Sequence, residues 1–232
     1  MQRFRNARRW AALTLVPAAA ATMITASLAV AQTDVLPESE EPSVAEPSSK
    51  QRKMRSKVVI RVKRHVLSGR TGVVRGAVWP HKGARKVSLR LNGKKVTTVR
   101  TGRGGRFRLR FRAPRPGIYR VVAITHRTDR AKPDRTRGKR VNVYRAAHAS
   151  YYGPGLYGNS TACGQTLTPS TKGVAHKTLP CGTKVTFRYR GRTVTARVID
   201  RGPYAAGREW DLTSATKAKL GFGSTGTVLS TR

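Results

Sequence analysis

The sequence predicts a mainly β protein in which a β-sandwich precedes a compact β-barrel. From residue 57 to residue 145, apolar and basic residues alternate with a period of two, which is typical of strands that bury one face. From residue 146 to residue 232, glycine and aromatic residues are dense and the apolar runs are short. The 232 residues are enough for two such domains.

The first 31 residues are typical of a secretory signal peptide. Four arginines precede an apolar run from about Trp10 to Val30, and the run ends in "AVA" before Gln32. A retained membrane anchor is the alternative, since an apolar helix of this length is able to span a bilayer. We therefore expect a secreted protein that contacts the membrane only through an uncleaved signal.

Residues 32–56 are predicted to form a disordered linker, because up to residue 49 they are rich in Pro, Ser and Glu. The whole chain has 48 Lys and Arg against 10 Asp and Glu, a net charge of +38. Thirty-two of the basic residues lie between residues 50 and 145. A charge of this size in an exported protein indicates a polyanionic partner, such as wall polymers, anionic lipid or extracellular nucleic acid.

Residues 57–145 are predicted to form a basic β-sandwich of immunoglobulin-like type. The strands are expected at residues 57–64, 71–78, 86–101, 105–112 and 117–126, with an Asn92-Gly93 hairpin turn in the third stretch. Six or seven short strands at this spacing are typical of a sandwich. The sequence lacks the Cys…Trp…Cys pattern, so the prediction concerns architecture alone.

The stretch "GRFRLRFR" is predicted to place arginines on one sheet face. Its apolar residues Phe107, Leu109 and Phe111 would point inward, and Arg106, Arg108, Arg110 and Arg112 outward. Such a row is able to bind anions, and we favour anionic wall polymers over a merely solubilising face. A nucleic-acid or heparin-like ligand is a third hypothesis. Specific nucleic-acid binding is not expected, because the aromatic residues point inward and leave no stacking platform.

Residues 146–232 are predicted to form the barrel with one short helix. The strands are expected at residues 184–190, 192–200 and 225–232. The helix is expected within residues 211–221, with Asp211 or Thr213 as the N-cap and Gly221 at its end.

Cys163 and Cys181 are expected to form a disulfide, because the compartment outside the cell is oxidising. A loop of this size would stabilise the fold by roughly 3 kcal/mol in the chain-entropy model. Two free thiols or half of a metal site are the alternatives. No Cys-x-x-Cys or paired Cys/His spacing supports a metal, and no organic cofactor is indicated.

The order of several short motifs resembles a known family. These are "SYYG" at 150–153, "TACG" at 161–164, "AHKTLPCGT" at 175–183, "DRGP" at 200–203 and "DLT" at 211–213. Residues 148–232 thereby resemble the double-psi β-barrel of rare lipoprotein A, which is related to barwin and expansin barrels. The resemblance implies a six-stranded barrel with a groove for peptidoglycan glycan strands. It does not extend to residues 50–145.

The resemblance also implies site residues. His176, Asp200 and Asp211 match family positions, and we assign them as candidate catalytic residues. The groove would be shaped by Tyr152, Thr161, Gln165 and Trp210, which are the candidate glycan-binding residues. Gln165 stands where catalytic members have a glutamate, and a glutamine cannot deliver a proton.

The carboxyl groups of the barrel restrict its chemistry. A hydrolytic glycosidase needs two carboxyl groups, whereas this part of the chain has only Asp200, Glu209 and Asp211. The resemblance implies that a lytic transglycosylase needs one. Trp210 is expected to raise the pKa of Asp211, and Arg201 to lower that of Asp200 if the two pair. Glu209 is expected to be an exposed charge.

Two functions stay open at this point: a lytic transglycosylase, and a non-catalytic, expansin- or barwin-like module that binds carbohydrate or loosens the wall. Gln165 favours the second. Each candidate residue also has a structural alternative. Asp200 is able to hold a turn, Asp211 to cap the helix, and His176 to donate or accept structural hydrogen bonds. Thr161 and Gln165 are able to close a turn.

Overall fold

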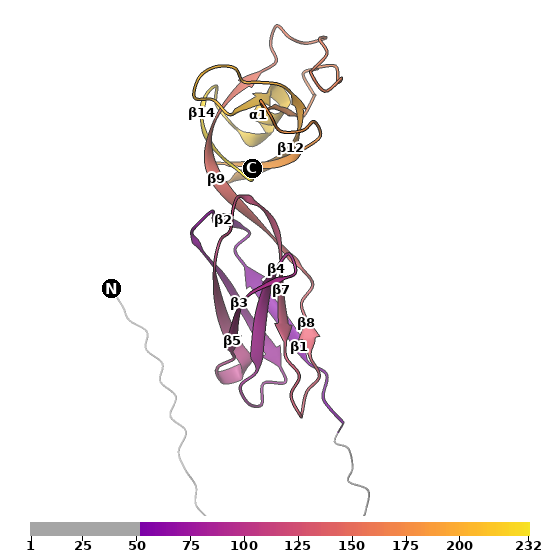
Figure 1. Ribbon diagram of the computed structural model, residues 1–232, viewed down its shortest axis with the longest axis vertical. Helices are drawn as coiled ribbons and strands as arrows, with labels where there is room; N and C mark the ends of the chain where they lie inside the picture. Colours follow the sequence, from indigo (N-terminus) through magenta and orange to yellow (C-terminus); the bar gives the residue numbers. More distant parts are fainter. Residues whose placement is uncertain (1–51) are drawn as a thin grey trace, which may run out of the picture. The chain divides into compact units, whose positions relative to one another are not determined.

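The computed structural model describes residues 52–232 (Figure 1). The signal peptide predicted at residues 1–31 lies outside the described residues, as does most of the predicted linker. The last part of that linker pairs with the chain further on: Met54 donates its backbone N–H to Arg130 O at 3.0 Å, and Lys132 donates to Met54 O at 3.0 Å. Between residues 52 and 232, no helix has the length and apolar character needed to cross a membrane.

The mainly β prediction is confirmed, and all five strand-bearing stretches expected in residues 57–126 form strands. The elements of this region are β1 (Lys57–Val62), β2 (His65–Leu67), β3 (Thr71–Trp79), β4 (Lys86–Leu91), β5 (Lys94–Arg100), η1 (Arg103–Gly105), β6 (Arg106–Arg112), β7 (Gly117–Thr125), β8 (Asp134–Arg135) and β9 (Lys139–Tyr152). Sequence reasoning missed β2, β8 and β9.

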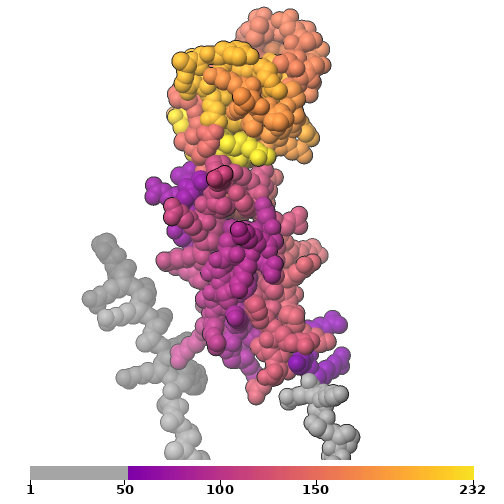
Figure 2. Space-filling model, in the orientation of Figure 1, coloured from indigo at the N-terminus to yellow at the C-terminus, as the bar shows by residue number. Residues whose placement is uncertain are grey.

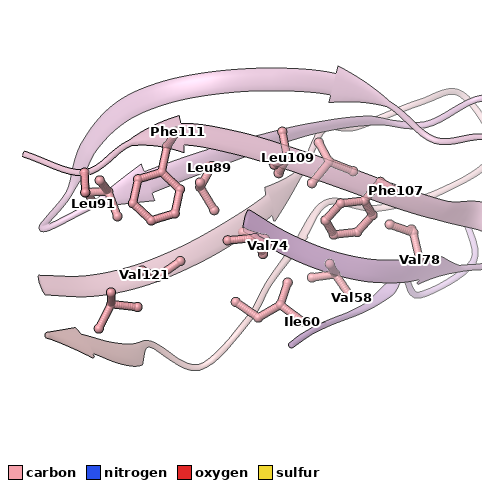
Figure 3. Close-up of a cluster of buried hydrophobic side chains, with 14 of the residues drawn as sticks. Val58, Ile60, Val74, Val78, Leu89, Leu91, Phe107, Leu109, Phe111 and Val121 are labelled. Atoms are coloured by element: carbon pink, nitrogen blue, oxygen red, sulfur yellow. The ribbon is translucent and has the colours of Figure 1, made fainter. Parts of the chain in front are cut away.

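The strands of residues 57–145 form two sheets that share one apolar core. Strands β1, β3 and β6 make an antiparallel sheet in the order β1-β3-β6, and β5-β4-β7-β9 follow one another in the second sheet. Figure 3 shows the inward side chains of both sheets. They include Val58, Ile60, Val74, Val78, Leu89, Leu91, Phe107, Leu109, Phe111 and Val121. The period-two alternation therefore places one face of each sheet in the core, whereas the immunoglobulin-like topology stays a prediction.

Strand β9 takes part in both halves of the fold. Residues Lys139 to Val143 pair with β7, residues Arg145 to Ala149 pair with β14, and the end of the strand pairs in parallel with β13. Figure 1 follows β9 from beside β2 into the barrel beside β14. The predicted boundary after residue 145 falls inside this strand, where its partners change.

The closed six-stranded barrel is confirmed. Its elements after β9 are β10 (Val174–Ala175), β11 (Lys184–Tyr189), β12 (Arg192–Asp200), β13 (Trp210–Thr213), α1 (Ser214–Leu220) and β14 (Gly226–Ser230). The ring runs β9-β13-β10-β12-β11-β14 and returns to β9. In Figure 2 the later barrel residues, coloured orange to yellow, gather into one rounded body.

The α-helix described between residues 52 and 232 begins directly after Thr213, which is one of the two predicted caps. Thr213 is the N-cap, and its side chain accepts a hydrogen bond from Thr216 N. Gly221 ends the helix in the left-handed conformation, as expected. Asp211 is not the cap, because Thr213 takes that position and the Asp211 carboxylate accepts a hydrogen bond from Ser150 instead. The side chain of Asp211 is therefore not used at the helix terminus.

Trp210 lies in the barrel core, so its assignment as a glycan contact was wrong. The side chain has no exposed surface. Its ring packs edge-on against Phe187, with 5.1 Å between the ring centroids. A sugar from solvent cannot stack on a ring without exposed surface. Alternation along β13 explains this placement, because the neighbouring Asp211 faces the other side of the strand.

We expect Trp210→Ala to lower the free energy of unfolding by about 3–5 kcal/mol, because it removes the largest side chain of the barrel core. Denaturant unfolding of the full chain measures this loss. A variant with wild-type stability but weaker binding to cell wall would contradict the placement of Trp210 in the core.

Candidate functional site

The register of β10 brings Asp200 and Asp211 to one place. Ala175 of β10 is the partner of Asp200 on β12 and also of Asp211 on β13. The two aspartates therefore flank the same short strand at the same level. Their backbones lie roughly two strand spacings, or about 10 Å, apart across the sheet. Ala175 between them has a small side chain, which leaves room above the sheet.

A hollow of about 250 Å³ lies over this part of the barrel. Tyr152, Asp200 and Asp211, which are three of the predicted site residues, line it. The rest of the lining comes from Leu156, Ala175 and the loop after β12, including Arg201, Gly202, Pro203, Tyr204, Ala205 and Arg208. The fold therefore unites residues that lie up to 59 positions apart in the sequence.

Asp211 has the environment of a proton donor. Burial raises the pKa of its carboxyl group, and the negative charge of Asp200 adds to this effect. The Ser150 hydroxyl donates a hydrogen bond to Asp211 Oδ1 at 2.9 Å, and this bond, together with the charge of Arg208, partly lowers the pKa again. Ser150 is the register partner of Asp211 on β9. Burial by the fold, rather than contact with Trp210 alone, thus favours the protonated form.

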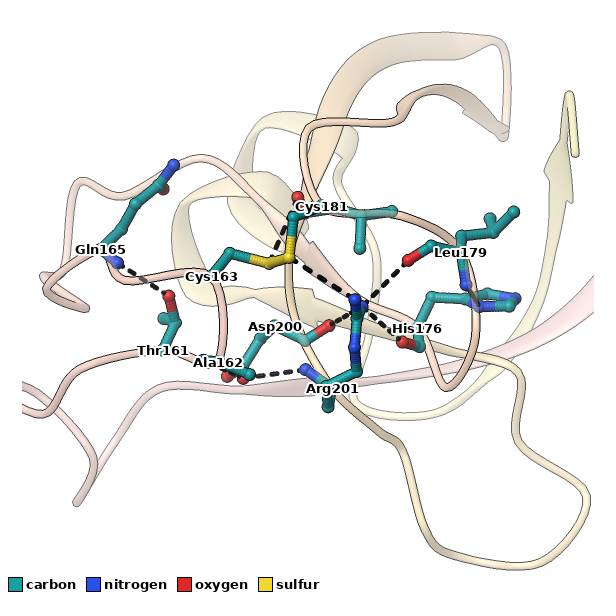
Figure 4. The surroundings of a disulfide bond; sticks show 10 residues. Thr161, Ala162, Cys163, Gln165, His176, Leu179, Cys181, Asp200 and Arg201 are labelled. Atoms are coloured by element: carbon teal, nitrogen blue, oxygen red, sulfur yellow. Dashed lines mark hydrogen bonds between the residues drawn. A yellow bond between two sulfur atoms is a disulfide. The ribbon is translucent and has the colours of Figure 1, made fainter.

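Asp200 holds the neighbouring loop through backbone hydrogen bonds. Its Oδ1 accepts from Ala162 N at 2.9 Å and from Arg201 N at 2.8 Å (Figure 4). This matches the structural alternative for Asp200 and still leaves the residue at the wall of the hollow. One carboxylate therefore both fixes the loop around Ala162 and supplies negative charge beside Asp211.

Arg201 does not pair with the Asp200 carboxylate, contrary to the possibility raised by their adjacency. Its Nη1 donates to Leu179 O at 2.9 Å and to His176 O at 3.3 Å. Its Nη2 lies 3.5 Å from Cys181 Sγ. The guanidinium group thereby holds the turn after β10 in place, because it contacts two backbone carbonyl oxygens and one sulfur atom of that turn (Figure 4).

The disulfide between Cys163 and Cys181 is confirmed. Cys163 also donates its backbone N–H to Ile199 O at 3.1 Å, one residue before Asp200. The disulfide and the Asp200 carboxylate thus attach the same loop to the barrel at neighbouring points.

Thr161 and Gln165 close a turn and do not line the hollow. Thr161 donates its backbone N–H to Gln165 O at 2.7 Å, and its Oγ1 accepts from Gln165 N at 3.2 Å. Thr161 is buried, whereas the side chain of Gln165 is exposed and extends away from Asp200 (Figure 4). The geometry supports the structural alternative for both residues.

His176 stands outside the lining of the hollow. Its Nδ1 accepts hydrogen bonds from the backbone N–H groups of Thr178 at 3.1 Å and Leu179 at 3.0 Å. Its ring packs on Trp210, with 4.6 Å between ring centroids. Burial lowers the pKa of His176; the charge of Glu209 opposes this, and nearby basic residues reinforce it. The neutral ring therefore shapes the turn after β10.

Glu209 is paired rather than freely exposed, so that expectation was wrong. Both of its carboxylate oxygens bond to the guanidinium group of Arg145, and its side chain is 28% exposed. The His176 Nε2 atom lies 3.9 Å from Glu209 Oε1. Arg145 neutralises Glu209, which does not line the hollow. The carboxyl groups of the hollow are therefore those of Asp200 and Asp211.

The hydroxyl of Tyr152 is buried next to the two aspartates. No described group meets it with full hydrogen-bond geometry, although the Asp200 carboxylate is close enough to act on it. Burial raises its pKa most, and the charge of Asp200, a hydrogen-bonding interaction with that carboxylate and the charge of Asp211 raise it further. The phenol is thus neutral and able to donate a hydrogen bond to a ligand in the hollow.

Sequence reasoning missed Leu156 and Tyr204 as lining residues. Tyr204 is 80% exposed and Leu156 46% exposed. A large aromatic residue directly after "DRGP" in a Gly- and Pro-rich loop was the available signal, since such a side chain has no core to enter. Among residues 52–232, no three His, Cys, Asp or Glu side chains are grouped to hold a metal ion.

Comparison with known proteins places this site in context. Residues 144–229 match the family model described as lytic transglycolase. A probable endolytic peptidoglycan transglycosylase RlpA of Synechocystis sp. is 40% identical over 98 residues, covering 38% of this chain and 30% of the relative. The endolytic peptidoglycan transglycosylase RlpA of Campylobacter jejuni is 42% identical over 82 residues, covering 34% of this chain and 30% of the relative. The probable endolytic peptidoglycan transglycosylase RlpA of Aquifex aeolicus is 33% identical over 139 residues, covering 59% of this chain and 56% of the relative. The chain thus spans 30% of the length of the first two relatives.

We expect Ser150→Ala to raise the pKa of Asp211 further, because the Ser150 hydroxyl stabilises the ionised carboxylate. NMR titration of the Asp211 carboxyl carbon in the full chain measures the shift. Ser68→Ala is the control, since Ser68 bonds to Pro114 O and should leave this titration unchanged. An unchanged or lowered pKa in Ser150→Ala would contradict the assigned hydrogen bond.

Proposed function

Residues 144–229 form an RlpA-like double-psi β-barrel domain, and from this premise we propose that the chain is an exported cell-wall protein whose barrel binds and cleaves peptidoglycan glycan strands. The reaction class is that of a lytic transglycosylase. The observation that carries the proposal is the raised pKa of Asp211 in a hollow shared with Tyr152 and Asp200.

Asp211 is assigned as the proton donor. In its protonated form the carboxyl group donates to the glycosidic oxygen as the bond to the anomeric carbon breaks. The carboxylate so formed then takes the proton of the sugar's own 6-hydroxyl, whose oxygen bonds to the anomeric carbon and gives an anhydro product. One carboxyl group completes both transfers, so the pairing of Glu209 with Arg145 does not prevent the reaction.

The other residues of the hollow position the glycan and tune the donor. The charge of Asp200 helps to keep Asp211 protonated. The buried phenol of Tyr152 is a hydrogen-bond donor without a partner among described groups. The exposed ring of Tyr204 offers an apolar face at the rim, where a sugar ring is able to stack.

The basic region of residues 57–145 is proposed to tether the protein to anionic wall polymers. It carries 28 Lys and Arg against two acidic residues, Asp129 and Asp134, which makes +26 of the net charge of +38. Like-charged side chains repel one another, so an anionic partner would stabilise this region as well as concentrate the barrel at its substrate.

A non-catalytic wall-binding module is the alternative, and Gln165 is the observation that favours it. The side chain at this position is an amide, and it points away from Asp200 (Figure 4). If the chemistry of related barrels depends on a carboxyl group there, this chain would bind glycan without cleaving it. The two functions differ in whether anhydro ends appear.

We expect Asp211→Asn to reduce the release of anhydro-ended products from peptide-stripped glycan strands by at least about 100-fold, because the proton donor is lost. Mass spectrometry of soluble products from the full chain measures this. Glu209→Gln is the matched carboxyl-to-amide control and should keep cleavage. No products from the wild type, with retained pull-down on insoluble wall, would establish the binding module instead.

The pH dependence follows from the same assignment. Because the donor must be protonated, cleavage should fall as pH rises through the pKa of Asp211, which burial raises from its ordinary value. Asp200→Asn removes a negative charge that raises this pKa, so the fall should move to lower pH. Rates measured across pH for both chains test this. A shift to higher pH in Asp200→Asn would contradict the roles given to the two residues.

We expect Tyr204→Ala to weaken binding to peptidoglycan freed of anionic polymer by about two- to tenfold, because an aromatic stacking surface is lost. The thermal unfolding midpoint should not change, since the side chain is 80% exposed. Tyr157→Ala, which changes an exposed tyrosine outside the hollow, is the control for a pull-down assay. Equal losses in both variants would exclude a specific contact at Tyr204.

A further inference from the structure

The outer face of the three-stranded sheet carries a set of six exposed arginines, here called the arginine face. Its members alternate with core residues along the strands. They are Arg61 on β1, Arg75 on β3, and Arg106, Arg108, Arg110 and Arg112 on β6. No acidic residue occurs in these three strands. The face is therefore a continuous cationic surface rather than a mixed-charge one.

Strand register sets three of these arginines in one row across the sheet. Arg75 is the partner of Arg61 on β1 and of Arg108 on β6. Like charges directly opposite one another destabilise an antiparallel pair. A sheet that keeps three in line therefore carries a cost in stability, and an anionic ligand would remove that cost.

The guanidinium groups of the arginine face are free to bind a ligand. Among residues 52–232, Glu209 forms the ion pair with Arg145, and the neutral ring of His176 lies 3.9 Å from the same carboxylate. None of the six side chains donates a hydrogen bond to a described group. By contrast, hydrogen bonds to protein groups are donated by Arg85, Arg140 and Arg201. The donors of this face are consequently available to an external anion.

Two hollows meet at the central arginine row. One of about 940 Å³ is bounded by Val59, Ala77 and Trp79 as well as by arginines. The second, of about 410 Å³, is bounded by Val62, Lys63 and Val73. Arg61, Arg75 and Arg108 line both. The surface is thus an extended depression with cations at its middle and exposed apolar side chains, Val59 and Trp79, at one end.

We propose that the arginine face binds a linear phosphodiester polymer of the cell wall, a chain of phosphate-linked small polyols. This inference rests on the proposed wall function and specifies the ligand and the surface of its tether. The planar fork of arginine donates two parallel hydrogen bonds to a phosphate, which lysine cannot do. Val59 and Trp79 offer contact to the carbon backbone of such a polymer.

The spacing along β6 suits a repeating anion. Alternate residues of a strand repeat at roughly 6.8 Å, so Arg106, Arg108, Arg110 and Arg112 present charges at regular short intervals. A phosphodiester polymer of small units also carries one charge per unit. Nucleic acid fits the surface less well, because Phe107 and Phe111 point into the core and Trp79 alone offers a ring for base stacking on this face.

The outer face of the second sheet provides an internal comparison. It also carries basic residues, but Arg90 donates to Gly93 O and Arg140 to Asn142 and Thr186. Lys86, Lys95 and Arg100 on this face are exposed and have no hydrogen-bond partner among described groups. These three give a control set of equal charge on a surface without the arginine row.

The test is the binding of full-length chain to soluble poly(glycerol phosphate) over a range of salt concentrations. The triple change Arg61→Gln, Arg75→Gln and Arg108→Gln should weaken binding by at least about tenfold and reduce the salt slope by about 2, from the loss of three phosphate contacts. The control change Lys86→Gln, Lys95→Gln and Arg100→Gln should stay within about twofold at physiological salt, where screening limits distant charges.

Two further arms make the test specific. Changing the same three arginines to lysine keeps the charge, and affinity should still fall because the guanidinium forks are lost. A single-stranded oligonucleotide with the same number of phosphates should bind no tighter than poly(glycerol phosphate). Equal losses in the glutamine variant and the control, wild-type affinity in the lysine variant, or clearly tighter oligonucleotide binding would each overturn the proposal.

Stability and cleavage separate this inference from the proposed function. The glutamine variant should unfold at a higher temperature than the wild type, because repulsion within the row is relieved. It should also release products from polymer-free glycan strands at the wild-type rate. Loss of polymer binding with intact cleavage supports the tether, whereas absence of cleavage in every chain would count only against the barrel's catalytic role.

Discussion

The position of one short strand is the constraint on which the candidate site depends. Strand β10 pairs with β12 on one side and β13 on the other, and Ala175 is in register with both Asp200 and Asp211. The closed ring then places Ser150 of β9 opposite Asp211. A shift of either pairing by one residue would turn an aspartate to the opposite face of the barrel. Chemistry at this site is therefore a consequence of register more than of any single side chain.

The three acidic residues of the barrel reach different electrostatic states. Arg145 pairs with Glu209, backbone N–H groups bind Asp200, and burial acts on Asp211 with one hydroxyl donor and no ion pair. Among the described carboxyl groups, that of Glu209 forms the ion pair with an arginine, although the chain has a net charge of +38. The fold keeps Arg201 away from Asp200 by directing its guanidinium group to backbone carbonyls. The protein thereby preserves one protonatable group among many cations.

The two regions use opposite physical strategies for their two proposed ligands in the cell wall. The barrel partly buries Tyr152 and Asp211, which strengthens the electrostatic interactions between the groups of the hollow. The arginine face keeps its cations in solvent, where binding is strong only if many contacts act together and where salt weakens it. Attachment of one chain by both modes would increase the effective concentration of the barrel at its glycan.

Local pattern in the sequence was sufficient for the elements whose structure depends on neighbouring residues. Alternation in "RFRLRFR" placed Phe107 inward and Arg108 outward, and Gly221 marked the end of the helix. The family motifs added the barrel, and the predicted export to an oxidising compartment added the disulfide. Tertiary structure alone decided that Trp210 is core, that Glu209 is paired and that Tyr204 lines the hollow. It also decided that β9 serves both halves of the fold. The reason is that burial and ion pairing of a side chain depend on strands distant in sequence, whereas alternation and turns are properties of adjacent residues.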